Sequence, residues 1–355
     1  MELGYFEYNQ SNKKGFLVAA IAVLGVIGVV GIGLANPSKP TSLRIQQLAI
    51  EEQEFRDYMD KFNKNYETEA EFAQRFQIFR ENSALIRAHN AKYSEPILEV
   101  NKFADLTNEE FMQKHIGQQR PVAEPSALKN SYGANYPDRV DWRDKGAVTD
   151  VKNQEDCYSG WAFSAVGAVE GAWFIKTGKL IPMSEQELVD CSEEFGNSGC
   201  LSGTIDAAYE FMEKYGITSQ ANYPYKGIEM KCNVTLEKNI VANVTGFTAV
   251  ESFSEEALQA AVVQRPVSVG VDSRGYIWQF YKTGVVTKFC GEEPNHDVLV
   301  VGYDKTNNDD PKKNFWIVKN SWGSDWGNEG YIYIGIEEGP GVCGIQVEPS
   351  YPIVN

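Results

Sequence analysis

The sequence is poor in the residues that most often bind metal ions and nucleic acids. It has 3 histidines and 6 cysteines among 355 residues, and no Cys-x-x-Cys pair occurs. Because zinc sites need several such ligands at short spacing, the pattern predicts neither a metal site nor a cofactor. Lys and Arg number 33 against 49 Asp and Glu, which gives a net charge of −16, most of it after residue 135. This acidity argues against nucleic acids as partners.

All cysteines follow residue 156, and the first 156 residues have none. An even number confined to one region favours disulfides over a metal site, and disulfides imply an oxidising compartment. Six cysteines allow fifteen pairings, among which the sequence alone does not choose. They are Cys157, Cys191, Cys200, Cys232, Cys290 and Cys343.

One long uncharged run occurs, at residues 15–35, directly after Lys13 and Lys14. At 1.5 Å per residue a helix of this length spans a hydrocarbon core of about 30 Å. The run predicts a membrane-spanning signal anchor, with residues 1–14 as a cytoplasmic tail and the rest of the chain in a lumen. The alternative is a cleaved signal peptide and a secreted protein, because Gly33 and Ala35 fit a small-x-small cleavage site.

A lumenal location makes two acceptor motifs available for glycosylation. Asn233 and Asn243 each begin an Asn-x-Thr triplet. Such triplets accept N-linked sugars when they lie on the surface of a secreted or lumenal protein. Both asparagines are therefore predicted glycosylation sites.

Helical patterns dominate the part that follows a spacer at residues 36–50. Apolar residues recur at helical spacing in 51–62, and a longer helical pattern comes next. Thr107 and Glu110 form a capping box that opens another short helix. Residues 118–135 contain Pro121 and Pro125 without apolar periodicity, so they are expected to form a linker. The longer pattern contains Glu71, Arg75, Phe79, Asn82, Ile86 and Asn90 at fixed spacing.

The remaining segment, 136–355, changes character along its length. Trp161, Ala165 and Val169 lie on one face of a helix that Gly178 ends. Later stretches, such as 314–318 and 331–334, have the pattern of strands. A helical half followed by a strand-rich half predicts an α+β domain of two lobes with a cleft between them.

Two motifs carry a resemblance to a known family. The segment 153–164, with Cys157 and Trp161, resembles the active-site segment of papain and cathepsin L-like cysteine proteases, but Gly160 stands at the position of the nucleophilic cysteine. The spaced residues from Glu71 to Asn90 resemble the family's inhibitory prosegment. The resemblance implies a papain-like two-lobe fold at 136–355, an inhibitory propeptide domain at 51–117 and a maturation cut within 118–135. It also implies the pairing Cys157–Cys200, Cys191–Cys232 and Cys290–Cys343.

The resemblance implies roles for four further residues. His296, 136 residues after position 160, is the base, and Asn320 orients its imidazole. Trp322 shields that hydrogen bond from water. Gln154 is the side-chain donor of the oxyanion hole, and the backbone N–H of residue 160 is the second donor. Ser159 is expected to cap the following helix with its hydroxyl and so cannot replace the thiol.

The same comparison implies a substrate cleft with altered walls. Glu348 is expected at the floor of the main specificity pocket, where an acid favours a basic side chain. Tyr158 and Glu155 replace glycines beside the nucleophile, and Ser202 replaces another, so the cleft is expected to be narrower. The residues expected around the pocket are Gly203, Thr204, Ile205 and Gly270.

Three functions remain open from the sequence. The leading hypothesis is a monomeric, membrane-anchored pseudoprotease of an endolysosome or vacuole, which binds peptide or protein ligands in its cleft without cleaving them. The second is an active cysteine endopeptidase in which Gly160 is not the native residue. The third is an inhibitor whose prosegment acts on related proteases as well as on its own domain.

Overall fold

The structure is a computed structural model, and it describes residues 42–117, 135–235 and 239–355. Contacts divide the chain into two units, Met1–Ala49 and Ile50–Asn355. Within the described residues no helix is long and apolar enough to cross a membrane. The predicted anchor at 15–35 and most of the predicted linker at 118–135 lie outside the described residues.

The helices of the prosegment form where the sequence predicts them, with one extension. Helix α1 (Ser42–Phe62) starts well before residue 51, so the described part of the predicted spacer is helical. Its sequence has no Gly or Pro, and Gln, Glu, Leu and Arg, which favour helices, recur along it. Helix α2 (Glu69–Lys92) follows, capped by Thr68. Helix α3 (Asn108–His115) begins with the predicted capping box, in which Thr107 and Glu110 bond each other's backbone.

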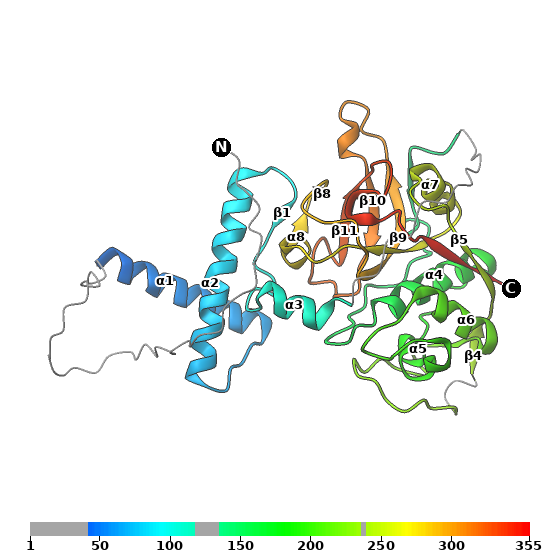
Figure 1. Cartoon of the computed structure of the whole chain (residues 1–355), viewed down its shortest axis with the longest axis horizontal. Coiled ribbons are helices and arrows are strands. Elements are labelled where there is room, and N and C mark those ends of the chain that lie inside the picture. The colour runs from blue at the N-terminus through cyan, green and yellow to red at the C-terminus, as the bar shows by residue number, and fades with distance from the viewer. Residues whose placement is uncertain (1–41, 118–134, 236–238) are drawn as a thin grey trace, which may run out of the picture. The chain divides into compact units, whose positions relative to one another are not determined.

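The prosegment packs on the strand-rich lobe (Figure 1). Strand β1 (Ile97–Leu98) pairs with β7 (Tyr281–Thr283), and Asn101 donates to the carbonyl of Gln279 at 2.7 Å. Arg75 of α2 forms an ion pair with Glu110 of α3 at 2.7 Å, which ties the two helices together. The Arg75 side chain therefore connects two helices of the prosegment.

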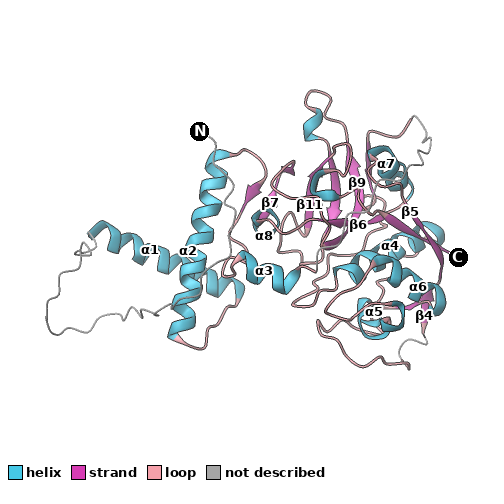
Figure 2. Cartoon of the chain, in the orientation of Figure 1, coloured by secondary structure: helices cyan, strands magenta, loops and turns pink. Residues whose placement is uncertain are grey.

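The first lobe of the following domain is helical, as Figure 2 shows in cyan. Helix α4 is buried along most of its length and ends at Gly178, whose φ of 72° is left-handed, as predicted. Helix α5 has Ser184 as its N-cap, and α6 has Thr204. The elements of this lobe are α4 (Gly160–Thr177), α5 (Glu185–Cys191), η1 (Glu193–Phe195), α6 (Ile205–Tyr215), β3 (Ile217–Thr218) and β4 (Ile240–Ala242).

The second lobe is built on one sheet, drawn in magenta in Figure 2. Its strand order is β5-β12-β6-β9-β10-β11-β8, with β2 added beside β9. Among the strands of the described residues, β11 and β8 pair in parallel and the other pairs are antiparallel. The strands are β2 (Arg139–Asp141), β5 (Val244–Ala249), β6 (Val267–Val271), β8 (Val285–Val286), β9 (His296–Asp304), β10 (Phe315–Lys319), β11 (Tyr331–Gly335) and β12 (Ser350–Val354). This lobe also has the α-helices α7 (Glu255–Gln264) and α8 (Tyr276–Phe280) and the short 3₁₀ helices η2 (Pro311–Lys313) and η3 (Val342–Gly344).

Strand β9 separates two hydrophobic cores. Successive side chains of a strand point to opposite faces. Val298 and Val300 therefore belong to the core shared by the sheet and the prosegment, whereas Leu299 and Val301 belong to the core around α4. Both lobes thus hold β9 from opposite sides, which fixes the position of its first residue, His296.

Candidate active site

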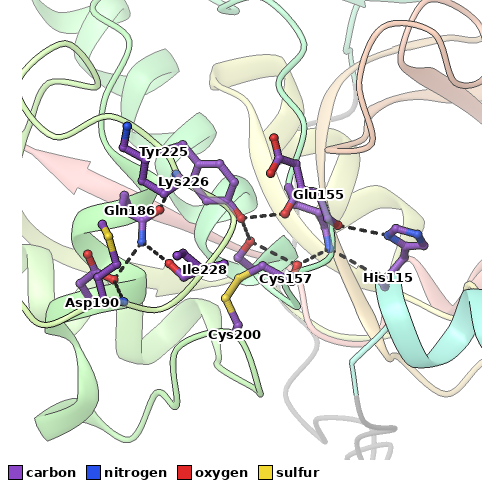
Figure 3. The surroundings of a disulfide bond; sticks show 12 residues. His115, Glu155, Cys157, Gln186, Asp190, Cys200, Tyr225, Lys226 and Ile228 are labelled. Carbon is purple, nitrogen blue, oxygen red and sulfur yellow. Dashed lines mark hydrogen bonds between the residues drawn. A yellow bond between two sulfur atoms is a disulfide. The ribbon is translucent and has the colours of Figure 1, made fainter. Parts of the chain in front are cut away.

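The N-terminus of α4 brings position 160 to the cleft. Cys157 forms a disulfide with Cys200 just before the helix, and Figure 3 shows the surroundings of this bond. Ser159 occupies the N-cap position, but the prediction for its hydroxyl is wrong, because the hydroxyl makes no capping bond. It lies 2.6 Å from the hydroxyl of Tyr225 and is fully buried. Tyr225 in turn donates to the backbone carbonyl of Gln154, so a side-chain partner takes the place of the helix backbone.

The sheet places His296 beside Asn320. β9 begins at His296 and β10 ends one residue before Asn320, and because the strands are antiparallel these ends meet. The distance from His296 Nε2 to Asn320 Oδ1 is 2.8 Å. The same oxygen accepts from the backbone N–H of Ser321, which fixes the orientation of the Asn320 amide. Trp322 stacks on the imidazole with 4.8 Å between ring centroids.

The imidazole lies directly against Gly160. A Cβ at position 160 would be 2.7 Å from both Nδ1 and Cε1 of His296, and 3.2 Å from the carbonyl oxygen of Asp297. Real Cβ atoms almost never come within 3.0 Å of such neighbours, so a side chain here would require a shift. The His296 ring therefore occupies volume that a side chain at position 160 would need.

Gln154 is buried at the same site with its amide held in one orientation. Its Oε1 accepts from the Ser321 hydroxyl at 2.6 Å, and its Nε2 donates to the carbonyl of Cys157 at 2.9 Å. The second Nε2 hydrogen is directed at the carbonyl of His115, 3.3 Å away. Since both carbonyls can only accept, the NH₂ group must face them.

His115, the last residue of α3, thus brings the prosegment into the cleft. Figure 3 shows its ring beside Glu155, whose carbonyl lies 3.2 Å from His115 Nδ1. The ring packs on Phe111 and Trp322. Burial lowers the pKa of His115 to about 4, although the Asp156 carboxylate, 3.9 Å away, opposes that shift.

A cavity of about 230 Å³ lies over these groups. Tyr158 and Ser202, two of the predicted departures from glycine, are in its wall. The third, Glu155, has a φ of 56°, a conformation that glycine adopts more easily. Gly203 must remain glycine, since a Cβ there would lie 2.3 Å from the Trp161 ring. The cavity is lined by His115, Gly117, Gln154, Tyr158, Gly160, Trp161, Gly196, Ser202, Gly203, Thr204, Asn295, His296 and Asp297.

A second cavity, of about 270 Å³, adjoins the first and contains the predicted pocket residues Thr204, Ile205 and Glu348. Glu348 is partly buried in its wall. Asp297 and Thr204 line both cavities, so the two are neighbours along the cleft. The fourth predicted pocket residue, Gly270, does not line this cavity as far as the described residues show. It lies on β6, where it pairs with Asp297 of β9.

The other candidate residues lie away from the cleft. Cys191 bonds to Cys232 and Cys290 to Cys343, so with Cys157–Cys200 all six cysteines are in the implied pairs. Asn233 and Asn243 are exposed. Within the described residues no cluster of three or more His, Cys, Asp or Glu side chains could hold a metal ion.

Comparisons with known proteins agree with this architecture. The family described as papain family cysteine protease matches residues 136–353, and the cathepsin propeptide inhibitor domain matches residues 55–111. Vignain of Phaseolus vulgaris is 44% identical over 297 residues, which cover 79% of this chain and 80% of vignain. The chain belongs to the papain family of cysteine proteases and carries that family's inhibitory prosegment.

Solved structures of proforms are similar over nearly the same range. The proform of the ragweed pollen allergen Amb a 11, a cysteine protease, has a TM-score of 0.78 and 36% identity, covering 87% of this chain and 97% of that one. Digestive procathepsin L 3 of Tenebrio molitor has a TM-score of 0.75 and 36% identity, covering 85% and 99%.

Sequence reasoning missed two contributors to the site. Ser321 fixes the Gln154 amide, and its place next to Asn320 in the same motif was an available signal. His115 offered none, because only the path of the prosegment brings its carbonyl to Gln154.

Proposed function

We propose that this chain is a papain-family pseudoprotease, which binds peptides or protein segments in its cleft and does not cleave them. One observation carries the proposal: position 160 has no side chain, and the imidazole of His296 lies 2.7 Å from where its Cβ would be. A thiol protease needs a thiolate beside the base. Loss of the nucleophile in the best-studied triad lowers kcat by about 10⁶-fold.

The neighbouring residues do not supply a substitute. Every cysteine is in a disulfide. The Ser159 hydroxyl is buried and hydrogen-bonded to the Tyr225 hydroxyl, which in turn donates to the backbone carbonyl of Gln154. The proposed site therefore has a base, an amide that orients it and a donor for an oxyanion. It has no group among these neighbours that could attack a carbonyl.

We place the domain in the lumen of an endolysosome or vacuole. The support is the sequence: an uncharged run at 15–35 after two lysines for an uncleaved anchor, three disulfides for an oxidising compartment, and two exposed acceptor asparagines. Residues 1–14 then form the cytoplasmic tail, and 118–135 contain the maturation cut between the propeptide domain and residues 136–355.

Peptide turnover tests the proposal. The purified chain, cut in its linker by an added site-specific protease, should hydrolyse a fluorogenic arginine peptide at least about 10⁵-fold more slowly than an active papain-family protease. Its cleft should still bind the uncleaved peptide. Turnover at ordinary rates by protein with verified Gly160 would show an active peptidase. Inhibition of an active relative by the uncut chain would favour the inhibitor hypothesis.

A further inference from the structure

We infer that a water molecule is bound between Glu185 and Asn320, and that Glu185 acts through this water as a positioning residue for the Asn320 amide. The inference concerns how the ring of His296 is held in its orientation. It goes beyond the proposed function, because it applies whether or not the chain cleaves peptides.

The site is a small cavity between the two lobes. Its volume is about 20 Å³, and it is lined by α4 and α5 of the helical lobe and by β9 and the end of β10 of the strand-rich lobe. A buried water needs on the order of 10–15 Å³ of such space, so the cavity has room for one. Glu185 and Asn320 both line it, and a water inside it therefore reaches both side chains.

Two buried polar atoms at this cavity need a partner. Glu185 is 1% exposed; its Oε1 accepts from Lys152, but its Oε2 has no hydrogen-bond partner among the described residues. Asn320 is 3% exposed; its Oδ1 accepts from His296 and Ser321, but its Nδ2 likewise has no partner there. Buried polar groups nearly always bond to protein or to ordered water. One water that accepts from Nδ2 and donates to Oε2 satisfies both atoms.

The residues around the cavity favour a neutral molecule over an ion. The basic residues Lys152 and Lys319 line it and disfavour a cation, whereas the acidic residues disfavour an anion. These acidic residues are Glu170, Glu185 and Asp297. Burial raises the pKa of Glu185, so its carboxyl group is easier to protonate than that of a free glutamate. Water suits both forms, because it donates to a carboxylate oxygen and accepts from a carboxylic acid.

The water connects α5 to the orientation of the His296 ring. Asn320 follows β10 directly, and its Oδ1 lies 2.8 Å from Nε2 of His296. The same oxygen accepts from the Ser321 N–H, so Nε2 must be the donor of the bond to His296. Rotation of the Asn320 amide would break that bond, and a water held by Glu185 opposes the rotation by retaining Nδ2 in the cavity.

Glu185 acts at a distance from the cleft. As far as the described residues show, it lines neither of the two cleft cavities. Its effect on His296 therefore passes through the water and Asn320, and not through contact with a ligand.

A crystal structure of the intact wild-type chain tests the water directly. At a resolution that shows ordered waters, one peak should lie within about 3.2 Å of both Glu185 Oε2 and Asn320 Nδ2. Density for an ion at this place, or no density within reach of both atoms, would overturn the inference. This measurement does not depend on the folding of any variant.

Two substitutions separate hydrogen bonding from charge. Glu185→Leu and Glu185→Gln both remove the carboxylate beside Lys152, but only glutamine keeps polar atoms at the cavity. Its Oε1 can accept from Lys152 while its Nε2 donates to the water, which still has a lone pair for Asn320. The glutamine variant should therefore keep the bridge, and the leucine variant should lose it.

The measured signal is the Nε2 proton of His296, observed by NMR in intact protein with isotope-labelled histidine. The chain has 3 histidines, so few ring signals need assignment. Exchange of this proton with solvent should be at least about ten-fold faster in Glu185→Leu than in the wild type, and unchanged in Glu185→Gln. Ten-fold corresponds to about 1.4 kcal/mol, within the range measured for one hydrogen bond.

Backbone hydrogen exchange in α4 is the internal reference, because a general loss of stability would accelerate it as well. Ring-proton exchange that is equal in all three proteins, or that rises only in step with α4, overturns the positioning role. Equal acceleration in both variants assigns the effect to charge and also overturns it. If Glu185→Leu does not fold, the wild-type crystal structure and the Glu185→Gln comparison still decide the inference.

Discussion

At the scale of single residues, the important feature of position 160 is how closely the ring of His296 packs against it. The imidazole of His296 lies 2.7 Å from the position that a Cβ of residue 160 would take, so no gap is left beside the glycine. The ring keeps its bond to Asn320 and its stacking on Trp322. The His296 ring is therefore held in one orientation, and it lies closer to position 160 than a side chain there would allow.

Gly160→Cys should restore measurable but incomplete peptidase activity in the prosegment-free protein. The new thiol would face an imidazole at a helix N-terminus, and both favour the thiolate. The ring must first move aside, and a misplacement of about 1 Å costs on the order of 10²-fold in rate. Turnover of a fluorogenic peptide measures the effect. Activity should disappear in Gly160→Cys/His296→Ala and after treatment with a thiol-directed epoxide. Folded Gly160→Cys protein that neither turns over nor reacts with the epoxide would show that the cleft has diverged beyond its nucleophile.

Glu348 should select a basic side chain in the second cavity. Its carboxylate lies partly buried in the wall, where a guanidinium can form a charge-assisted hydrogen bond. The wild type should bind a peptide with Arg at the pocket position about ten-fold more tightly than a matched peptide with Leu. Glu348→Ala should bind the two peptides with about equal affinity. Calorimetry provides the comparison, and equal affinities for the wild type would mean that the carboxylate faces away from the ligand.

At the scale of elements, α3 is expected to loosen in acid. The docked pKa of His115 is about 4, below the ordinary 6.5 of a free histidine. A lowered histidine pKa means that docking is strongest above pH 6.5 and weakens as pH falls toward 4. The loss is at most about 3 kcal/mol, since one pKa unit corresponds to about 1.36 kcal/mol.

The measurement compares the wild type with His115→Phe, which keeps a ring but cannot titrate. Urea unfolding at pH 7.5 and pH 4.5 should show the wild type losing more stability than the variant over this range. The other two histidines are common to both proteins and cancel in the difference. Identical losses would show that His115 does not sense the pH.

Local sequence signals predicted where helices begin and end more accurately than they predicted which side chains contact each other. The capping box at Thr107 and the left-handed Gly178 depend on neighbouring residues alone, and both form as predicted. The Ser159 hydroxyl was predicted as a cap, but Tyr225, far along the chain, competes for it. The early start of α1 was missed because proline and serine before residue 42 suggested a spacer.

At the scale of the whole molecule, the prosegment and the strand-rich lobe share one hydrophobic core. Phe55 and Phe111 of the prosegment belong to the same cluster as Trp278 and Trp326 of the lobe. The family resemblance predicted that the prosegment would dock on the domain. The site was predicted only in outline from the sequence. The resemblance paired His296 with Asn320 but could not give the distance of the His296 ring from Gly160.

The intact chain should keep its prosegment in acid. Under the proposed function the chain has no thiol with which to cut itself, so loosening of α3 alone leaves the linker uncut. Purified protein incubated at pH 4.5 with reductant should show one band of unchanged size on a denaturing gel, whereas a parallel sample with an added active protease should be shortened. Conversion without added protease, in a preparation free of other peptidases, would contradict the pseudoprotease proposal.

The complete pairing of the cysteines has a consequence for how the chain folds. Disulfides exchange when a free thiolate attacks one of their sulfurs. The oxidised protein has no free cysteine, so it contains no internal attacker that could shuffle its three bonds. A cysteine at position 160, three residues after Cys157, would place such an attacker beside the Cys157–Cys200 disulfide. With glycine at position 160, the chain therefore offers no such internal route to scrambled isomers during oxidative folding.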